Sequence, residues 1–223
     1  MGPIEASLSP AATAAQLLLV RHGESVPLTE RRDDEMLDPP LSPRGCTQAI
    51  ALADALRQAN ISAIYSSNMK RALKTAATIA SARNMQVTPL SGLGEVQILK
   101  NLPSGKTLTD LMCRDDWNIA AQQFVASGRW DSFPVSEGSV EFRSRVRATL
   151  DHIIGDHKTG GVTCVVTHGG VINAVLAELL GIQRDYFFRP AHCSISRIAM
   201  NYERRVVISI NEVCHIEASN RSS

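Results

Sequence analysis

The sequence predicts an α/β fold, in which helices cover both faces of a mostly parallel sheet to make a three-layer α/β/α sandwich. Two observations lead to this prediction. Short apolar runs that are typical of buried strands alternate along the chain with longer segments whose apolar residues recur at helical spacing. Two of these runs end in polar residues and glycine, as strands do where they turn toward a following helix. Neither an internal repeat nor a dividing linker interrupts the pattern, so we expect a single domain over residues 16–216.

The first half of the chain supplies strands and helices in alternation. Leu17–Val20 is apolar throughout and predicts the first buried strand. Ser42 and Pro43 then start a helix, because serine is a favoured cap and proline fits the first helical position. The apolar stripe of this helix consists of Ala49, Leu52, Ala53 and Leu56. The elements expected next are a strand over 61–65, a helix over 69–83 and a strand over 86–90.

The second half continues the alternation after a less regular stretch over 91–136. We expect a helix over about 108–125 and a second over about 139–154. The second helix carries an apolar stripe of Phe142, Val146, Leu150 and Ile153. The remaining elements are a strand over 162–167, a helix over 171–180 that Gly181 ends, and two late strands, 194–200 and 205–210, that can add an antiparallel edge.

The composition excludes several classes of partner and site. The formal net charge of +1 gives no reason to expect nucleic acid or an anionic membrane, so local cations would have to bind a substrate anion. The five cysteines are scattered without a CxxC pair. This spacing argues against a disulfide framework or a zinc site and favours a reducing cytosol, and we expect Cys164 to be a small buried hydrophobe.

We expect flexible tails at the two ends, over residues 1–15 and 217–223. The first segment has no basic region ahead of an apolar one, so it does not resemble a signal peptide. The apolar stretches are too short to span a bilayer. We therefore expect a cytoplasmic protein without a membrane partner, and a homodimer remains an open alternative.

Two histidines stand where two predicted strands end. His22 and His168 each follow an apolar strand and precede a glycine, which lets backbone approach a ligand closely. Ligands of open α/β sheets bind at the carboxyl ends of the strands. Arg21 precedes His22, and Arg71 opens the helix after the second strand. Guanidinium groups match phosphate oxygens in pairs, and helix N-termini add donors, so these residues predict a phosphate pocket.

Arg21-His22-Gly23-Glu24 resembles the signature of the histidine phosphatase superfamily, which includes cofactor-dependent phosphoglycerate mutase. Further blocks follow in family order and extend the resemblance over most of the chain, from Leu17 to Ile198. Leu41–Ala49 resembles the family's L-T/S-x-x-G-x-x-Q-A helix start, Tyr65–Ala72 its Y-S-S-x-x-x-R-A segment, Leu93–Glu95 its L-x-E segment, and Thr167–Ile172 its second histidine motif. The resemblance implies a phosphoglycerate mutase-like fold.

The resemblance also implies roles for these residues. His22 would attack phosphorus and form a phosphohistidine. Arg21, Arg71 and His168 would hold the phosphoryl oxygens and spread the charge of the transition state. Glu95 would be the general acid that protonates the leaving oxygen and then activates water. The scheme uses no metal and no cofactor, and the sequence shows no convincing metal-ligand spacing.

Each candidate also has a structural alternative. A lone histidine is usually a surface or satisfied core residue, Arg71 beside Lys70 could be a solvated helix residue, and a glutamate in a glycine-rich loop is commonly just exposed. Three other histidines, His152, His157 and His215, are expected on the surface. A structural role and a place near the pocket are both open for His192, which stands where the family commonly has asparagine. Trp117, Trp130 and Phe133 could form a lid or belong to the core.

The sequence departs from the family pattern in four places. Leu28 falls near a position where many members have a phosphate-binding asparagine, and Ser25 is a candidate substitute, with Gly169 as a further substrate contact. The charged stretch 30–35 is expected to be a solvated loop at the pocket mouth. Val96–Lys100 does not match the family's G-x-W-E-G segment, and Ser136–Ser139 matches its Gly-Glu-Ser only in part. The Tyr/Pro-rich insertion of the mutase branch is not found either.

These departures favour a phosphatase over a mutase and leave the substrate open. We expect a phosphomonoesterase that acts on a small phosphorylated metabolite. The alternatives are phosphoglycerate mutase, dephosphorylation of a phosphoprotein, and a catalytically inactive binding module on the same fold. Fold-level analogy does not supply the substrate.

Overall fold

A computed structural model describes residues 15–32, 37–106, 108–156, 161–200 and 205–216. The strands are β1 (Ala15–Arg21), β2 (Ile61–Ser66), β3 (Val87–Pro89), β4 (Val162–Thr167), β5 (Ile195–Met200) and β6 (Arg205–Glu212). The α-helices are α2 (Pro43–Ala55), α3 (Lys70–Ser81), α4 (Leu108–Leu111), α5 (Arg114–Ser127), α6 (Ser139–Asp156) and α7 (Gly169–Leu180). Short 3-10 turns are η1 (Leu28–Glu30), η3 (Ser91–Leu93) and η4 (Trp130–Ser132).

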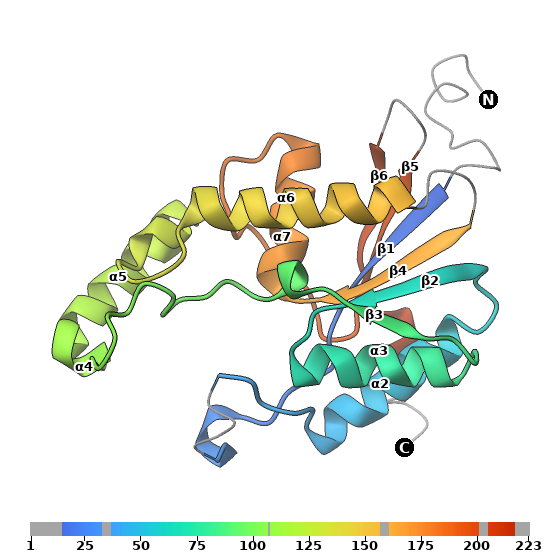
Figure 1. The fold of residues 1–223 in the computed structure, drawn as a ribbon, viewed down its shortest axis with the longest axis horizontal. Coiled ribbons are helices and arrows are strands. Elements are labelled where there is room, and N and C mark those ends of the chain that lie inside the picture. Colours follow the sequence, from blue (N-terminus) through green and yellow to red (C-terminus); the bar gives the residue numbers. More distant parts are fainter. Residues whose placement is uncertain (1–14, 33–36, 107, 157–160, 201–204, 217–223) are drawn as a thin grey trace.

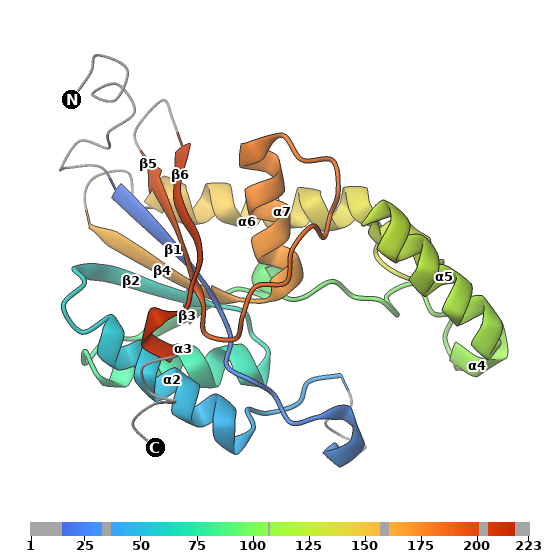
Figure 2. The ribbon, with the colours of Figure 1, turned by 180° about the vertical axis from the view of Figure 1, so that it is seen from behind.

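The strands form one sheet in the order β3-β2-β4-β1-β5-β6. The pairs from β3 to β1 are parallel, whereas β5 and β6 pair antiparallel to their neighbours. Figures 1 and 2 show α6 and α7 on one face of the sheet and α2 and α3 on the other. The predicted α/β fold with a mostly parallel sheet is therefore confirmed, and so is the late antiparallel edge.

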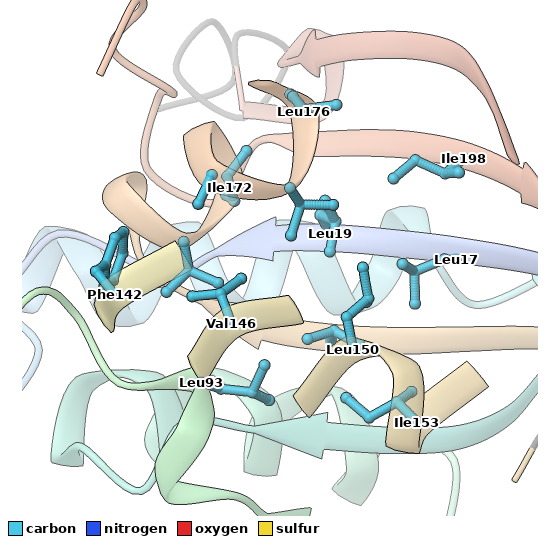
Figure 3. Close-up of a cluster of buried hydrophobic side chains, with 14 of the residues drawn as sticks. Leu17, Leu19, Leu93, Phe142, Val146, Leu150, Ile153, Ile172, Leu176 and Ile198 are labelled. Atoms are coloured by element: carbon cyan, nitrogen blue, oxygen red, sulfur yellow. The ribbon is translucent and has the colours of Figure 1, made fainter. Parts of the chain in front are cut away.

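Alternate residues of β1 enter two separate cores, because successive side chains of a strand point to opposite faces. Leu17 and Leu19 pack with α6 and α7, while Leu18 and Val20 pack with α2 and α3. The first core, shown in Figure 3, includes the predicted stripe of α6: Phe142, Val146, Leu150 and Ile153. Burying each such side chain stabilises the fold by about 1.5–3 kcal/mol. Both faces of the central strand are thereby held rigidly.

Aromatic and sulfur-containing residues add to these cores. Trp130 and Phe133 are buried in the first core, and Trp117 packs against it while partly exposed. The core alternative is thus the right one for Trp130 and Phe133. Cys164 is fully buried, as expected.

Local signals at helix ends act as predicted. The Ser42 side chain accepts a hydrogen bond from the Gly45 backbone N–H at 3.0 Å, and Pro43 is the first residue of α2. Gly181 ends α7 in the left-handed conformation, with φ of 68°. The Ser42 N–H also donates to the Glu24 carbonyl at 2.9 Å, so the start of α2 lies beside the segment that follows β1.

Three expectations need correction. The helix expected over about 108–125 is two helices, because the Cys113 N–H donates to Asp116 Oδ2 at 2.9 Å and caps a new helix, α5. Ala15, expected in the tail, is the buried first residue of β1. His215 is not simply on the surface: it is half-buried, and its Nε2 donates to the Cys193 carbonyl at 2.9 Å.

Other expectations fall outside the described residues, namely the tails over 1–14 and 217–223, His157, and residues 33–35 of the charged loop. His152 is exposed, as expected. Within the described part of the chain, no helix is long and apolar enough to cross a membrane.

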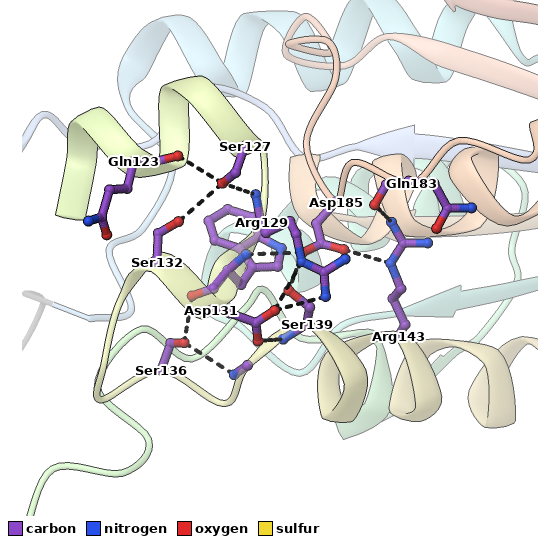
Figure 4. A network of polar contacts seen from close by, with 12 residues as sticks. Gln123, Ser127, Arg129, Asp131, Ser132, Ser136, Ser139, Arg143, Gln183 and Asp185 are labelled. Carbon is purple, nitrogen blue, oxygen red and sulfur yellow. Dashed lines mark hydrogen bonds and ion pairs between the residues drawn. The ribbon is translucent and has the colours of Figure 1, made fainter.

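A polar network joins α5, α6 and the segment that follows α7 (Figure 4). Its hub is Asp185, which is fully buried. The Asp185 carboxylate accepts hydrogen bonds from the Trp130 N–H at 3.0 Å, from the Ser139 hydroxyl, and from Arg143 Nε at 2.6 Å. This network fixes the first turn of α6 against the segment after α7.

Candidate active site

The ends of β1 and β4 bring His22 and His168 together. These strands are parallel neighbours, with Arg21 opposite Thr167, and the His22 N–H donates to the Thr167 carbonyl at 2.9 Å. The two imidazole rings lie 5.0 Å apart between centroids. They are 5% and 0% exposed respectively, which rules out the surface alternative for both.

The hydrogen bonds of His22 assign its tautomer. Nδ1 lies 2.7 Å from the carbonyl oxygen of Gly23, which can only accept, so Nδ1 carries the proton. Nε2 accepts from Arg71 Nε at 3.2 Å and therefore presents a lone pair. Burial lowers the pKa of His22 well below its usual value, and the neighbouring His168 and Arg71 lower it further. A neutral imidazole with an available Nε2 is what nucleophilic attack requires.

His168 is held by a serine at the end of β2. Its Nε2 lies 2.8 Å from Ser67 Oγ, which itself accepts from the Met69 N–H at 3.2 Å. We assign the Ser67 hydroxyl as the donor to Nε2. Burial first, and then Arg71 and Arg21, lower the pKa of His168 well below its usual value. The single proton of the neutral ring then lies on Nδ1, which has no hydrogen-bond partner among the described residues.

Two arginines flank the histidines. Arg71 lies in the first turn of α3 and is only 8% exposed, so it is not a solvated helix residue. Its Nη1 lies 3.6 Å from Asp38 Oδ1. Arg21 is partly buried, and its Nη1 donates to the Pro190 carbonyl at 2.5 Å. Arg21 Nε and Arg71 Nη1 are buried without a hydrogen-bond partner among the described residues, so each arginine keeps a free donor.

Glu95 follows η3 and reaches the start of α7. Its Oε1 and Oε2 accept from the Gly170 N–H at 3.1 and 3.2 Å, and Oε1 also accepts from the Val96 N–H at 3.0 Å. Burial raises the pKa of Glu95, although these hydrogen bonds and the two arginines act in the opposite direction. A Cβ on Gly170 would lie 2.3 Å from Glu95 Oε1, so the missing side chain leaves room for the carboxyl group.

Of the two other expected substrate contacts, Gly169 lies at the start of α7 beside the site, whereas Ser25 does not bind the site residues. Gly169 is buried and begins α7, and its carbonyl accepts from Asn173 Nδ2 at 2.8 Å. Ser25 forms a backbone bridge with Leu41 and, among the described residues, makes no hydrogen bond to the histidines or arginines of the site. Nothing is described of the Leu28 side chain.

His192 lies beside His22. The ring centroids are 5.5 Å apart, and His192 Nδ1 donates to the His22 carbonyl at 3.2 Å. Burial and the charge of Arg21 lower the pKa of His192 to about 4. A cavity of about 400 Å³ adjoins His192 and Arg21, and its lining includes Arg44 and Arg189.

The sequence did not single out Thr75, whose hydroxyl accepts from the Gly23 N–H at 3.1 Å and donates to the Arg71 carbonyl at 2.8 Å. Its spacing of four residues from Arg71 places both on one helix face and could have indicated it. The sequence did not single out Tyr186 either. Its hydroxyl lies close to the start of α7, because a Cβ on Gly169 would be only 3.3 Å from it. No local pattern indicates a tyrosine in the segment after α7.

Among the described residues, no cluster of three or more histidine, cysteine or acidic side chains could hold a metal ion. The site therefore consists of two neutral imidazoles, two guanidinium groups with free donors, and a carboxyl group with a raised pKa. Such a set can bind a tetrahedral oxyanion, attack it through nitrogen and supply a proton.

The chain is similar to known proteins over most of its length. A family model of the histidine phosphatase superfamily (branch 1) matches residues 17–213. The chain is 31% identical over 203 residues to phosphoserine phosphatase 1 of Hydrogenobacter thermophilus, covering 90% of this chain and 94% of the relative. It is 29% identical over 187 residues to a Yersinia pestis protein named "Probable phosphoglycerate mutase GpmB", covering 82% and 84%. Among solved structures, YhfR of Bacillus stearothermophilus superposes with a TM-score of 0.75 at 26% identity, covering 91% of this chain and 100% of YhfR.

Proposed function

Because the chain belongs to branch 1 of the histidine phosphatase superfamily, we propose that it hydrolyses a phosphomonoester of a small metabolite through a phosphohistidine on His22. One observation carries the proposal. Arg21 Nε, Arg71 Nη1 and His168 Nδ1 are buried without hydrogen-bond partners in the described part of the chain. A buried donor without a partner costs about 1–3 kcal/mol, and a phosphoryl group offers the acceptor oxygens that would satisfy all three.

The first step transfers the phosphoryl group to His22. The Nε2 lone pair forms a bond to phosphorus while the bond from phosphorus to the ester oxygen breaks. The leaving oxygen takes the electron pair of that bond and a proton from the Glu95 carboxyl group. A raised pKa of Glu95 favours this step because it keeps the carboxyl group protonated closer to neutral pH. Arg21, Arg71 and His168 stabilise the negative charge on the oxygens in flight.

The second step returns the site to its starting state. The Glu95 carboxylate takes a proton from a water molecule as the water oxygen bonds to phosphorus. The bond from phosphorus to Nε2 breaks, and its electron pair returns to the imidazole. Ester and water have then become alcohol and inorganic phosphate, with the proton back on Glu95.

The test is release of inorganic phosphate from a panel of phosphomonoesters, with a chelator present, by wild type and His22→Ala. The panel includes 4-nitrophenyl phosphate, glycerol phosphate, phosphoserine and phosphoglycerate. The last two carry a carboxylate, which the arginines of the cavity beside Arg21 could attract. We expect hydrolysis by wild type and only the background rate with the variant. Wild-type turnover that survives in His22→Ala would exclude His22 as the nucleophile.

The relative named as a phosphoglycerate mutase supports a second candidate. A mutase would return the phosphoryl group to a second hydroxyl instead of to water. The same assay separates the two, because a mutase interconverts phosphoglycerate isomers with little phosphate release. If folded wild type interconverts the isomers and hydrolyses no member of the panel, the mutase is the better assignment.

A further inference from the structure

Glu137 and Arg145 form a paired set of charges at the start of α6. Arg145 Nε and Nη2 donate to Glu137 Oε1 and Oε2 at 3.0 and 2.8 Å, in a two-pronged geometry. The Glu137 side chain is fully buried and that of Arg145 is 21% exposed. A buried pair of this kind adds little net stability, but its directional hydrogen bonds fix geometry.

The remaining donors of Arg145 reach the segment that carries Glu95. Nη1 donates to the carbonyls of Gly92 and Gly94 at 2.8 and 3.0 Å, and Nη2 lies 3.5 Å from the carbonyl oxygen of Glu95 itself. One guanidinium group thus holds the backbone immediately before the Glu95 carboxyl group.

Glu137 holds the same segment on the other side of Glu95. Its Oε2 accepts from the Gln97 N–H at 2.9 Å, and its backbone N–H donates to the Gln97 carbonyl at 3.0 Å. The segment also packs tightly on α6, because a Cβ on Gly92 would lie 1.9 Å from Thr149 Oγ1. The backbone on both sides of Glu95 is therefore tied to α6.

Resting on the proposed function, we propose that Glu137 and Arg145 are positioning residues, which hold the Glu95 carboxyl group where it can protonate the leaving oxygen. Neither makes a hydrogen bond to His22 or His168, although the charge of Arg145 is the smallest of the causes that lower the pKa of His168. Neither is required to touch substrate. The need for such support is physical: displacing a catalytic group by about 1 Å can cost roughly a hundredfold in rate.

The groups that face the Glu95 carboxyl come from several elements: Arg21 at the end of β1, Arg71 on α3, the N–H groups of Val96 and Gly170, and Tyr186 after α7. A variant that removed Arg145 alone would leave the Glu137 carboxylate unpaired. Its kinetics would then report the added negative charge as well as any displacement of Glu95. The double variant Arg145→Met/Glu137→Gln, hereafter the neutral pair, removes both charges and keeps the net charge constant.

The kinetic test compares the neutral pair with Glu95→Gln on an alkyl phosphate and on 4-nitrophenyl phosphate, whose leaving group needs little protonation. We expect the neutral pair to lower kcat on the alkyl phosphate by about tenfold to a hundredfold, with KM and the aryl rate nearly unchanged. In the Glu95→Gln background the neutral pair should cause no further loss. If the neutral pair lowered kcat in the Glu95→Gln background by as much as in wild type, the inference would be overturned, because the pair would then act independently of Glu95.

The double variant Arg143→Met/Asp185→Asn is the matched control, because it also removes both members of a buried ion pair that involves α6. Arg143 also lies on α6 and binds a buried carboxylate, Asp185, but its contacts are with the segment after α7 and not with that of Glu95 (Figure 4). We expect this variant to lose stability while it keeps the wild-type ratio of alkyl to aryl rates. If it reproduces the rate pattern of the neutral pair, the effect is general loosening and the inference fails.

A measurement without turnover separates this inference from the proposed function. If Glu95→Gln itself shows no preference for aryl phosphates, the general-acid role fails, and positioning is then judged by NMR titration of the ¹³C-labelled Glu95 carboxyl group. The neutral pair should move the pKa of Glu95 from its raised value toward that of an ordinary glutamate, as the carboxyl group gains water. The control Arg143→Met/Asp185→Asn should leave it in place. An unchanged pKa in the neutral pair would overturn the positioning role.

Discussion

We expect acid to destabilise this protein, because the folded state keeps His192 neutral beside His22. Burial and Arg21 lower the pKa of His192 to about 4. In the unfolded chain a histidine has a pKa of about 6.5. Between these two values the unfolded state binds more protons than the folded state, so stability is lost as the pH falls through this window.

The size of the loss follows from the two pKa values. Lowering the pH from 7.5 to 5.5 should cost about 1.4 kcal/mol through His192 alone, and the cost should reach about 3 kcal/mol near pH 4. His22 and His168 act in the same direction, because burial also lowers their pKa values. Glu95 acts in the opposite direction: its raised pKa lets the folded state bind a proton before the unfolded state does.

Urea unfolding at both pH values, followed by the fluorescence of buried Trp130, measures this effect. His192→Asn removes the titrating group, while its amide can still donate to the His22 carbonyl. We expect the difference between the two free energies of unfolding to shrink by about 1.4 kcal/mol in this variant. The control is His152→Asn on α6, where the side chain is 60% exposed. If His192→Asn kept the wild-type difference between the free energies of unfolding at the two pH values, the reasoning would be refuted. His192 would then be protonated equally in the folded and unfolded states.

Three further outcomes are expected. Glu95→Gln should lower kcat on alkyl phosphates by about 10²–10⁴-fold and far less on 4-nitrophenyl phosphate, as measured by phosphate release; equal losses would contradict the general-acid role. Gly45→Ala should destabilise the fold by about 1–3 kcal/mol in urea unfolding, since a Cβ there would lie 2.0 Å from the backbone oxygen of Glu24; an unchanged midpoint would contradict that close approach. Inorganic phosphate at 100 times its Kd should raise the free energy of unfolding by about 2.7 kcal/mol. Arg71→Met should remove most of this gain at the same phosphate concentration, and an undiminished gain would place the anion elsewhere.

Local physics explains which elements could be predicted from the sequence. Ser42 and Pro43 start α2 and Gly181 ends α7, since caps and left-handed residues are decided within one turn. The apolar run Leu17–Val20 is buried on both faces because helices cover both sides of its sheet. The start of α5 at Cys113 was missed, since cysteine is not among the residues that usually cap helices.

The candidate site was harder to predict because its geometry depends on contacts that are distant in sequence. The ends of parallel strands brought His22 and His168 together by topology, which sequence patterns do reveal. One partner of the Glu95 carboxyl group is the backbone N–H of Gly170, 75 residues away. A pattern of side chains does not predict such a backbone donor. Glu137 and Arg145 are eight positions apart. The partial match of Ser136–Ser139 to the family's Gly-Glu-Ser does not show that this pair would bind the segment around Glu95.

Burial at the site has two consequences for the proposed chemistry. It keeps His22 neutral and raises the pKa of Glu95, as nitrogen attack and proton donation require. It also leaves donors of Arg21, Arg71 and His168 without protein hydrogen-bond partners in the described part of the chain, where an anion can accept from them. The two cores on either face of β1 fix the strand end that carries His22 without polar help from the site. An anion that accepted hydrogen bonds from the three donors would therefore bind at a strand end that apolar packing already holds in place.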